Sequence, residues 1–319
     1  MNKQVYRRKQ MTTLSQQIER YLNYCQFQKR LSEKTLKAYK IDLHQFCSFL
    51  QDNLHEPNKE GVEKYTIWLH HECKPKTVKR KIACLKTFFS FLEFEGLCES
   101  NPFLKLKIKF NQPFVLPKTL SLETIQRVFQ AAYLEYQNSS LTEYQRKIAL
   151  RDAAVLELLF ATGARVSEIC SLNKSDIDFI YGVIKINGKG SKERLIQIGN
   201  SDVLKILKQY NIVFEEQINS SNYFFVNKFN NRLSEQSVRN IIKKYADKCG
   251  ITTHITPHMF RHTFATLLLE EDVDIRYIQK FLGHSSIVTT QIYTHVTSKK
   301  QKQILVAKHP RNKLSFNAG

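Results

Sequence analysis

Residues 253–266, THITPHMFRHTFAT, combine the start of a helix with two side chains that bind anions. Thr256 is a favourable N-cap, and Pro257 suits the first helical position. His258 and Arg261 follow three residues apart, on one face of the first turn. A helix start already offers unpaired amides and a partial positive charge to an anion. An added imidazole and guanidinium therefore predict a site for phosphate oxygens, whereas either residue alone would be ordinary.

The same stretch also allows a metal-binding interpretation. His254, His258 and His262 repeat every four residues, the spacing of two ligands on one helix face. Met259, however, stands where a His-Glu-x-x-His motif needs its glutamate, and no cysteine or carboxylate pair lies close by. We therefore expect no metal and no other cofactor.

A second arginine of the same kind lies in residues 161–172, ATGARVSEICSL. Gly163 lets the chain turn out of one helix, and Arg165 opens the next. Glu168 follows three residues later, where it could hold a guanidinium or the amides of the turn. A second arginine directed at phosphate matters, because phosphoryl transfer needs cations on oxygens whose charge builds in the transition state.

A candidate nucleophile lies in residues 281–296, FLGHSSIVTTQIYTHV. Gly283 and His284 end one helix, and Ser285 can cap the next. Tyr293 follows nine residues after His284. The residue type alone leaves two interpretations open, an aromatic on a helix face or a nucleophile, since the chain has 14 tyrosines.

The elements before these motifs are helical from residue 14 to about residue 94. Ser32 is a plausible N-cap for a helix whose apolar face includes Leu43 and Leu50. A later helix is expected over residues 77–95. Its start carries a basic run that is typical either of a solvated face or of a contact with the DNA backbone. The candidate DNA-binding residues of this run are Lys76, Lys79, Arg80 and Lys81.

Three prolines in residues 101–119, NPFLKLKIKFNQPFVLPKT, interrupt the helical pattern. We therefore predict a helical domain over residues 1–110, a linker over 111–120 and a second domain over 121–319. In the second domain helices resume at Ser121, and two strands flank the turn GKGSKE. The expected fold is mainly α, with a mostly helical α+β second domain that contains a small antiparallel sheet.

The charge is strongly positive, with 49 Lys+Arg against 29 Asp+Glu and a net charge of +20. Up to residue 115 the chain carries 21 basic and 11 acidic residues, a net of +10, and the remainder carries 28 and 18, again +10. Both parts are therefore expected to contact a polyanion. The seven cysteines form no Cys-x-x-Cys pair, and no signal peptide or membrane-spanning run is evident. These features predict a soluble, cytoplasmic protein with reduced thiols and no membrane partner.

Together, Arg165, His258-x-x-Arg261, Leu-Gly-His284 and Tyr293 in a Tyr-Thr-His setting resemble the tyrosine recombinase (integrase) family. The order and the local spacings agree, as does the short hairpin with lysines between the first two motifs. The tail Ala-Lys-His-Pro-Arg, residues 307–311, resembles the C-terminal ending of the Xer recombinases of bacteria.

The resemblance implies a site-specific DNA recombinase with a helical, SAM-like core-binding domain before the catalytic domain. Its partners would be double-stranded DNA carrying a recombination site and further copies of itself, as a tetramer on two sites. A partner recombinase could also take part. Chromosome dimer resolution and mobile-element integration or excision both remain open, since they use the same active site.

The resemblance also implies roles for the motif residues. Arg165 and Arg261 would clamp the scissile phosphate, with Glu168 supporting the arginines. His258 would bind the phosphate and accept the proton of Tyr293, which attacks phosphorus to give a 3′-phosphotyrosyl link. A further set would complete the site: His284 as an additional donor, Lys189 as the acid for the leaving oxygen, and Lys192 as a DNA-backbone contact and the alternative acid.

Two other functions fit part of the pattern. A type IB topoisomerase uses a similar set of residues, but a separate helical domain and a tail beyond Tyr293 favour recombination. A helical DNA-binding regulator without catalysis would explain the charge but not the whole set of phosphate-handling residues in order. A P-loop ATPase is excluded, because Gly188-Lys189-Gly190 lies in a hairpin and lacks the Gly-Lys-Ser/Thr sequence.

Overall fold

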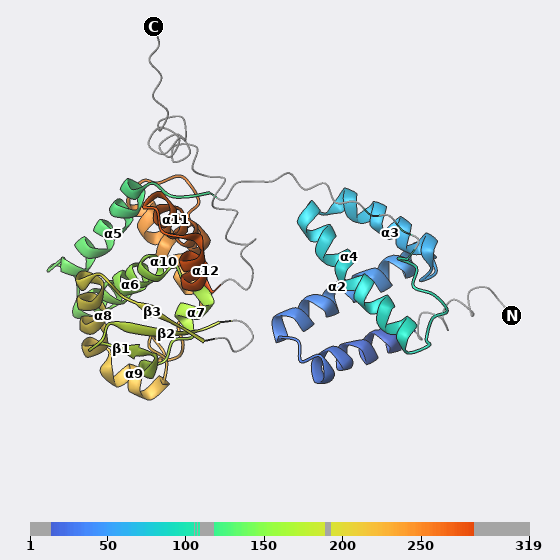
Figure 1. Cartoon of the computed structure of the whole chain (residues 1–319), viewed down its shortest axis with the longest axis horizontal. Coiled ribbons are helices and arrows are strands. Elements are labelled where there is room, and N and C mark those ends of the chain that lie inside the picture. Colours follow the sequence, from blue (N-terminus) through green and yellow to red (C-terminus); the bar gives the residue numbers. More distant parts are fainter. Residues whose placement is uncertain (1–13, 105, 107, 109–117, 189–192, 284–319) are drawn as a thin grey trace, which may run out of the picture. The chain divides into compact units, whose positions relative to one another are not determined.

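The computed structural model describes residues 14–104, 106, 108, 118–188 and 193–283 of the 319-residue chain, and these residues are coloured in Figure 1. The chain divides into two compact units, one ending at Phe114 and the other beginning at Val115. Most of the expected linker, residues 111–120, lies outside the described residues.

The first unit is made of helices. Ser32 caps α2 as expected, since its hydroxyl accepts a hydrogen bond from the Thr35 amide at 3.3 Å. Helix α2 packs against both α3 and α4. The described helical elements are residues 14–23, the π-helical turn η1 (Tyr24–Gln28), α2 (Glu33–Asp52), α3 (Lys59–Glu72) and α4 (Pro75–Phe94).

Aromatic side chains fill the core of the first unit. Phe46 of α2 meets Tyr65 of α3 and Phe89 of α4, with ring centroids 5.0 and 6.0 Å apart, and all three rings are buried. The stripe expected on α2 faces this core, because Leu43 and Leu50 are also fully buried. The helical periodicity of the sequence therefore located the core of this unit correctly.

One acidic residue is buried in the first unit together with a lysine. Asp42 of α2 accepts hydrogen bonds from Lys81 Nζ at 2.7 Å and from Arg80. Lys81 also donates to Gln45 Oε1 at 2.5 Å and is only 5% exposed. This placement corrects the expected DNA contact for Lys81, because its ammonium is engaged inside the unit. Arg80 also pairs with the buried Asp42, but its own side chain is exposed, as is Lys76.

The second unit is built around α6, a long helix that is buried along most of its length. Thr142 and Gln145 start it with a reciprocal capping box, at 3.3 and 3.0 Å. Helices α5, α7, α8, α10 and α11 all pack against α6 (Figure 1). The helices are α5 (Leu122–Gln137), α6 (Glu143–Thr162), α7 (Val166–Cys170), α8 (Ser201–Val213), α9 (Glu215–Ser221), α10 (Glu235–Lys248), α11 (Pro257–Glu270) and α12 (Ile275–Leu282), with a 3-10 turn, η2 (Lys174–Asp176).

A small antiparallel sheet in the order β1-β2-β3 completes the second unit. Strands β2 (Val183–Asn187) and β3 (Glu193–Gln197) form the expected hairpin, and Asn187 pairs with Glu193 at its end. Strand β1 (Ile177–Asp178) was not expected from the sequence, because two residues are too short to show an alternating pattern. The mainly α fold with a small antiparallel sheet is confirmed.

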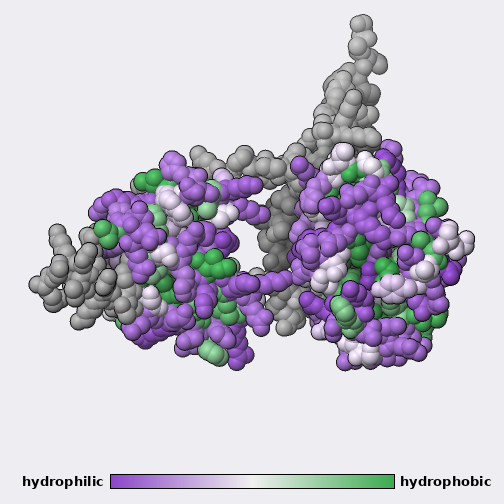
Figure 2. Space-filling model, turned by 180° about the vertical axis from the view of Figure 1, so that it is seen from behind, coloured by the Kyte–Doolittle hydropathy of each residue, from purple (hydrophilic) through white to green (hydrophobic). Residues whose placement is uncertain are grey.

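Hydrophilic side chains cover most of the visible face of each unit in Figure 2. Scattered hydrophobic residues remain exposed, as on most folded proteins. Among the described helices, none has the length and apolar character needed to cross a membrane.

The buried acid of the first unit yields a test of stability. We expect Asp42→Asn to lower the free energy of unfolding by about 3–5 kcal/mol, because Lys81 would be left buried without a counter-charge. Trp68, the only tryptophan of the chain, packs against Tyr65 in this unit, so its fluorescence in urea reports this unit alone. Asp52→Asn, at the exposed end of the same helix, serves as the control. A midpoint for Asp42→Asn equal to that of the control would contradict the interpretation.

Candidate active site

The link between α6 and α7 places Arg165. Gly163 ends α6 in the left-handed conformation, with φ 58°, and a Cβ there would lie 2.4 Å from Phe264 Cδ1. Only glycine fits this turn, which sets Arg165 at the N-cap of α7. Glu168 then accepts from the Arg165 amide and from Arg165 Nη1, each at 2.8 Å. Of the two roles considered for Glu168, holding the guanidinium or holding the turn, it performs both.

A second arginine at this carboxylate, Arg194, was not expected from the sequence. Its Nη2 donates to Glu168 Oε2 at 2.8 Å and its Nη1 donates to Glu168 Oε1 at 3.2 Å, so the pair is bidentate. Its Nε donates to the carbonyl of Phe281 at 2.8 Å. The alternation of β3 could have revealed it, because Arg194 lies two residues before the buried Ile196, on the same inward face.

Arg261 lies inside the second unit and is 4% exposed. Its Nη1 donates to the Gly163 carbonyl at 2.8 Å and its Nη2 to the Leu282 carbonyl at 2.7 Å. Pro257 occupies the first turn of α11 as expected. Thr256 stands at the N-cap, but its side chain forms no capping hydrogen bond, which differs from the expectation.

The histidines of α11 differ in their surroundings. His258 is exposed, whereas Arg261, three residues further along the same helix, is buried. The rings of His258 and His262 have centroids 6.4 Å apart. Burial lowers the pKa of His262 to about 4, with smaller contributions from His258 and Arg261. His262 is therefore neutral near pH 7.

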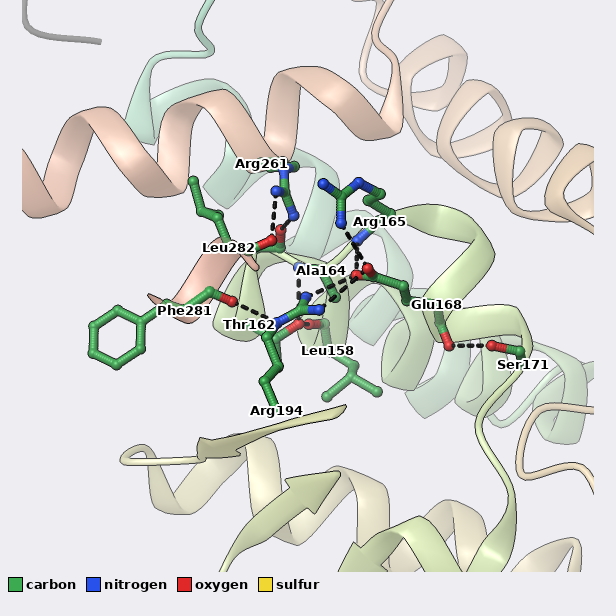
Figure 3. A network of polar contacts seen from close by, with 11 residues as sticks. Leu158, Thr162, Ala164, Arg165, Glu168, Ser171, Arg194, Arg261, Phe281 and Leu282 are labelled. Atoms are coloured by element: carbon green, nitrogen blue, oxygen red, sulfur yellow. Dashed lines mark hydrogen bonds and ion pairs between the residues drawn. The ribbon is translucent and has the colours of Figure 1, made fainter. Parts of the chain in front are cut away.

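Two arginines also bind the carboxyl end of α12. The helix ends at Leu282, and Gly283 adopts the left-handed conformation with φ 62°. The carbonyls of Phe281 and Leu282 accept hydrogen bonds from Arg194 and Arg261, as Figure 3 shows. Both arginines thus meet the negative end of a helix dipole.

The cluster of Arg165, Arg194, Arg261 and Glu168 is called here the arginine cluster. Three guanidinium groups and one carboxylate leave a balance of two positive charges (three minus one). The Arg165 side chain is 35% exposed and faces solvent more than those of the other three members. The cluster can therefore receive an oxyanion, and Arg165 is the member that a large polyanion meets first.

Opposing effects act on the pKa of Glu168. Burial raises it, but the hydrogen bonds and charges of Arg194 and Arg165 outweigh burial, and the net pKa is lower than that of an ordinary glutamate. Glu168 is therefore ionised at neutral pH, as its pairing with guanidinium groups requires.

Several expected site residues lie outside the described residues, namely Lys189, Lys192, His284 and Tyr293. The structure does bring Arg165, Glu168 and Arg261 together. It also places strand β3, which begins directly after residues 189–192, against α12, which ends two residues before His284.

The lowered pKa of Glu168 yields a prediction about pH. A depressed folded-state pKa contributes stability that is present above the ordinary glutamate value of about 4.3 and is lost as pH falls through the folded value. Glu168→Gln should therefore cost about 3 kcal/mol at pH 7, and the deficit relative to the natural protein should shrink below about pH 4. Calorimetry at both pH values measures it, with Glu216→Gln on α9 as an exposed control. A deficit that is independent of pH would mean that Glu168 is not ionised in the folded protein.

The two units each match a known family. Residues 120–300 match the Phage integrase family, and residues 18–96 match the N-terminal SAM-like domain of phage integrases. A tyrosine recombinase of Agathobacter rectalis is 52% identical over 309 residues, which cover 96% of this chain and 100% of the relative. Tyrosine recombinase XerC of Oceanobacillus iheyensis is 35% identical over 94% of this chain and 98% of its own length.

Solved structures share the fold at lower identity. The XerH site-specific recombinase bound to a palindromic difH substrate has a TM-score of 0.73 at 21% identity, over 92% of this chain and 84% of that one. A lambda integrase tetramer bound to a Holliday junction has a TM-score of 0.66 at 18% identity, over 88% and 76%. With both units matched and relatives aligned along nearly their whole length, this chain belongs to the phage integrase family of tyrosine recombinases.

Proposed function

We propose that this chain cuts and rejoins DNA at a specific site by forming a covalent link between Tyr293 and a DNA 3′-phosphate. The observation that carries the proposal is the arginine cluster, in which Arg165 and Arg194 hold Glu168 and Arg261 binds the neighbouring Gly163 and Leu282 carbonyls, while Arg165 stays accessible. Guanidinium groups match the non-bridging oxygens of a phosphodiester and stabilise the charge that builds on them. Family membership and relatives named tyrosine recombinase support the same reaction.

In the proposed first step, the phenolic oxygen of Tyr293 attacks phosphorus while His258 accepts its proton. The bond between phosphorus and the 5′-oxygen breaks, and Lys189 gives that oxygen a proton. The products are a 3′-phosphotyrosyl link and a free 5′-hydroxyl. Since phenoxide is a good leaving group, a 5′-hydroxyl of another strand can reverse the step and rejoin DNA without ATP. His284 would add a hydrogen bond to the same phosphate.

Recombination requires four strands to be cut, so we propose a tetramer that holds two DNA sites in the cytoplasm. The tetrameric lambda integrase on a Holliday junction and the XerH complex with difH support this arrangement by their fold. The balanced basic charge of both parts of the chain supports DNA contact by each. Lys76 and Lys79, which are exposed on α4, are the proposed backbone contacts of the first unit, and Arg80 can join them.

The function is tested with DNA that carries two copies of the site recovered by footprinting the bound protein. A recombinase yields recombinant products from this DNA. Relaxed circles alone would identify a topoisomerase, and binding without strand cleavage would identify a regulator. The origin of the recovered DNA also distinguishes a chromosomal site from the end of a mobile element.

The nucleophile is tested by replacing one phenolic oxygen. Tyr293→Phe should bind the site with unchanged affinity but form no covalent adduct on a nicked substrate, because the attacking atom is gone. Tyr277→Phe, an exposed tyrosine on α12, is the matched control and should form the adduct. Denaturing electrophoresis measures the adduct. The assignment is wrong if the control loses the adduct and Tyr293→Phe keeps it.

The two turn lysines are separated by a change of leaving group. Lys189→Ala should slow cleavage by about 10²–10⁴-fold, the usual contribution of a general acid, and a 5′-thio leaving group should restore the rate because it needs little protonation. Lys192→Ala should weaken binding and reduce its salt dependence by about one counterion. Rescue of Lys192→Ala by the 5′-thio substrate, with none for Lys189→Ala, would exchange the two roles.

A further inference from the structure

We propose that Arg194 is a positioning residue that fixes Arg165 and the carboxyl end of α12 to one another. A single guanidinium makes both connections: its two terminal nitrogens bind Glu168, and its Nε binds the Phe281 carbonyl. These partners lie 26 and 87 residues away in the sequence. Figure 3 shows the side chain between them.

The first connection links Arg194 to Arg165, because both guanidinium groups donate to the same oxygen of Glu168. Glu168 Oε1 accepts from Arg165 Nη1 at 2.8 Å and from Arg194 Nη1 at 3.2 Å. Because the two guanidinium groups hold one carboxylate, a shift of Arg194 moves Glu168 and with it the anchor of Arg165. Within the described residues, the partly exposed Arg165 side chain is held by its pair with Glu168.

The second connection is reinforced by close packing at Gly283. A Cβ on this residue would lie 2.9 Å from Arg194 Nη1 and 3.2 Å from its Cζ. The left-handed backbone of Gly283 also favours glycine. The guanidinium therefore rests directly against the last turn of α12, which cannot move toward β3 without displacing Arg194.

Arg194 also follows closely after the hairpin turn. Strand β3 begins at Glu193, so Arg194 is the second residue after residues 189–192. One side chain thus links three parts of the proposed active site. It is connected to Arg165 through Glu168, it lies two residues after Lys192, and it contacts the end of α12, after which the chain continues to His284 and Tyr293. The catalytic meaning of this link rests on the proposed function, whereas the link itself rests on described contacts.

A direct contact of Arg194 with DNA is the competing role. The side chain is only 11% exposed, and the contacts at Glu168 and Phe281 engage all three of its nitrogens. It is therefore a partner of protein groups, and its effect on DNA is exerted through Arg165.

The experiment compares Arg194→Lys and Arg194→Gln in the full-length chain, with Arg239→Gln on α10 as a matched loss of an arginine outside the cluster. Lysine keeps a positive charge beside Glu168 but lacks the planar fork that reaches two partners at once. Three quantities are measured: the melting temperature, amide hydrogen exchange by peptide, and single-turnover formation of the covalent adduct at saturating DNA.

We expect Arg194→Lys to recover most of the melting temperature that Arg194→Gln loses, but not the rate of adduct formation. Both variants should form the adduct about 10- to 100-fold more slowly, with DNA affinity changed by less than about threefold. Peptides covering 275–283 should exchange faster, while those of α5 and α6 should not. Arg239→Gln should match the natural protein.

Three results would overturn the proposal. Parallel recovery of stability and rate in Arg194→Lys would show a purely structural role. Faster exchange throughout the second unit, or unchanged exchange in 275–283, would show that the link to α12 is not local. A loss of DNA affinity as large as the loss of rate would show a DNA ligand. If the natural protein forms no adduct, the proposed function fails, and the exchange measurement still decides whether Arg194 fixes α12.

Discussion

The carboxylate of Glu168 is buried, and a buried charge is tolerated only when opposite charges and hydrogen bonds surround it. For Glu168 these opposite charges are Arg165 at the start of α7 and Arg194 on β3. Neutralising this one carboxylate therefore requires two separate elements to lie side by side. Arg194, which binds Glu168, also binds the Phe281 carbonyl and so fixes the end of α12. The positions of Arg165 and Arg194 in the arginine cluster thus follow from the electrostatics of a single carboxylate.

The first unit applies the same physical rule with different residues. Asp42 is buried on α2 and is neutralised by two consecutive residues of α4, one buried and one at the surface. In both units a buried acid holds an arginine whose side chain is still partly exposed, Arg80 at 47% and Arg165 at 35%. An exposed guanidinium anchored in this way loses less conformational entropy when it meets a phosphate than an untethered one would.

Much of this organisation could be predicted from local patterns in the sequence. The spacing of apolar residues located the helices, and the types and order of Arg165, Glu168 and Arg261 singled out residues that the structure brings together. Contacts between distant segments could not be read in this way. Nothing near Lys81 in the sequence shows that Asp42, 39 residues earlier, lies opposite it. Arg194 was missed for the same reason, because its partners lie far away along the chain.

The end of α12 has a further electrostatic consequence. Unpaired carbonyls at a helix end carry a partial negative charge, equivalent to about half an elementary charge, which would repel an approaching phosphodiester. Arg194 and Arg261 bind two of these carbonyls and so reverse the sign of the field at this edge of the cluster. These hydrogen bonds are short and shielded from water, so dissolved ions screen them little. Rising ionic strength should therefore lower the affinity of the protein for DNA while leaving the hydrogen bonds of the arginine cluster intact.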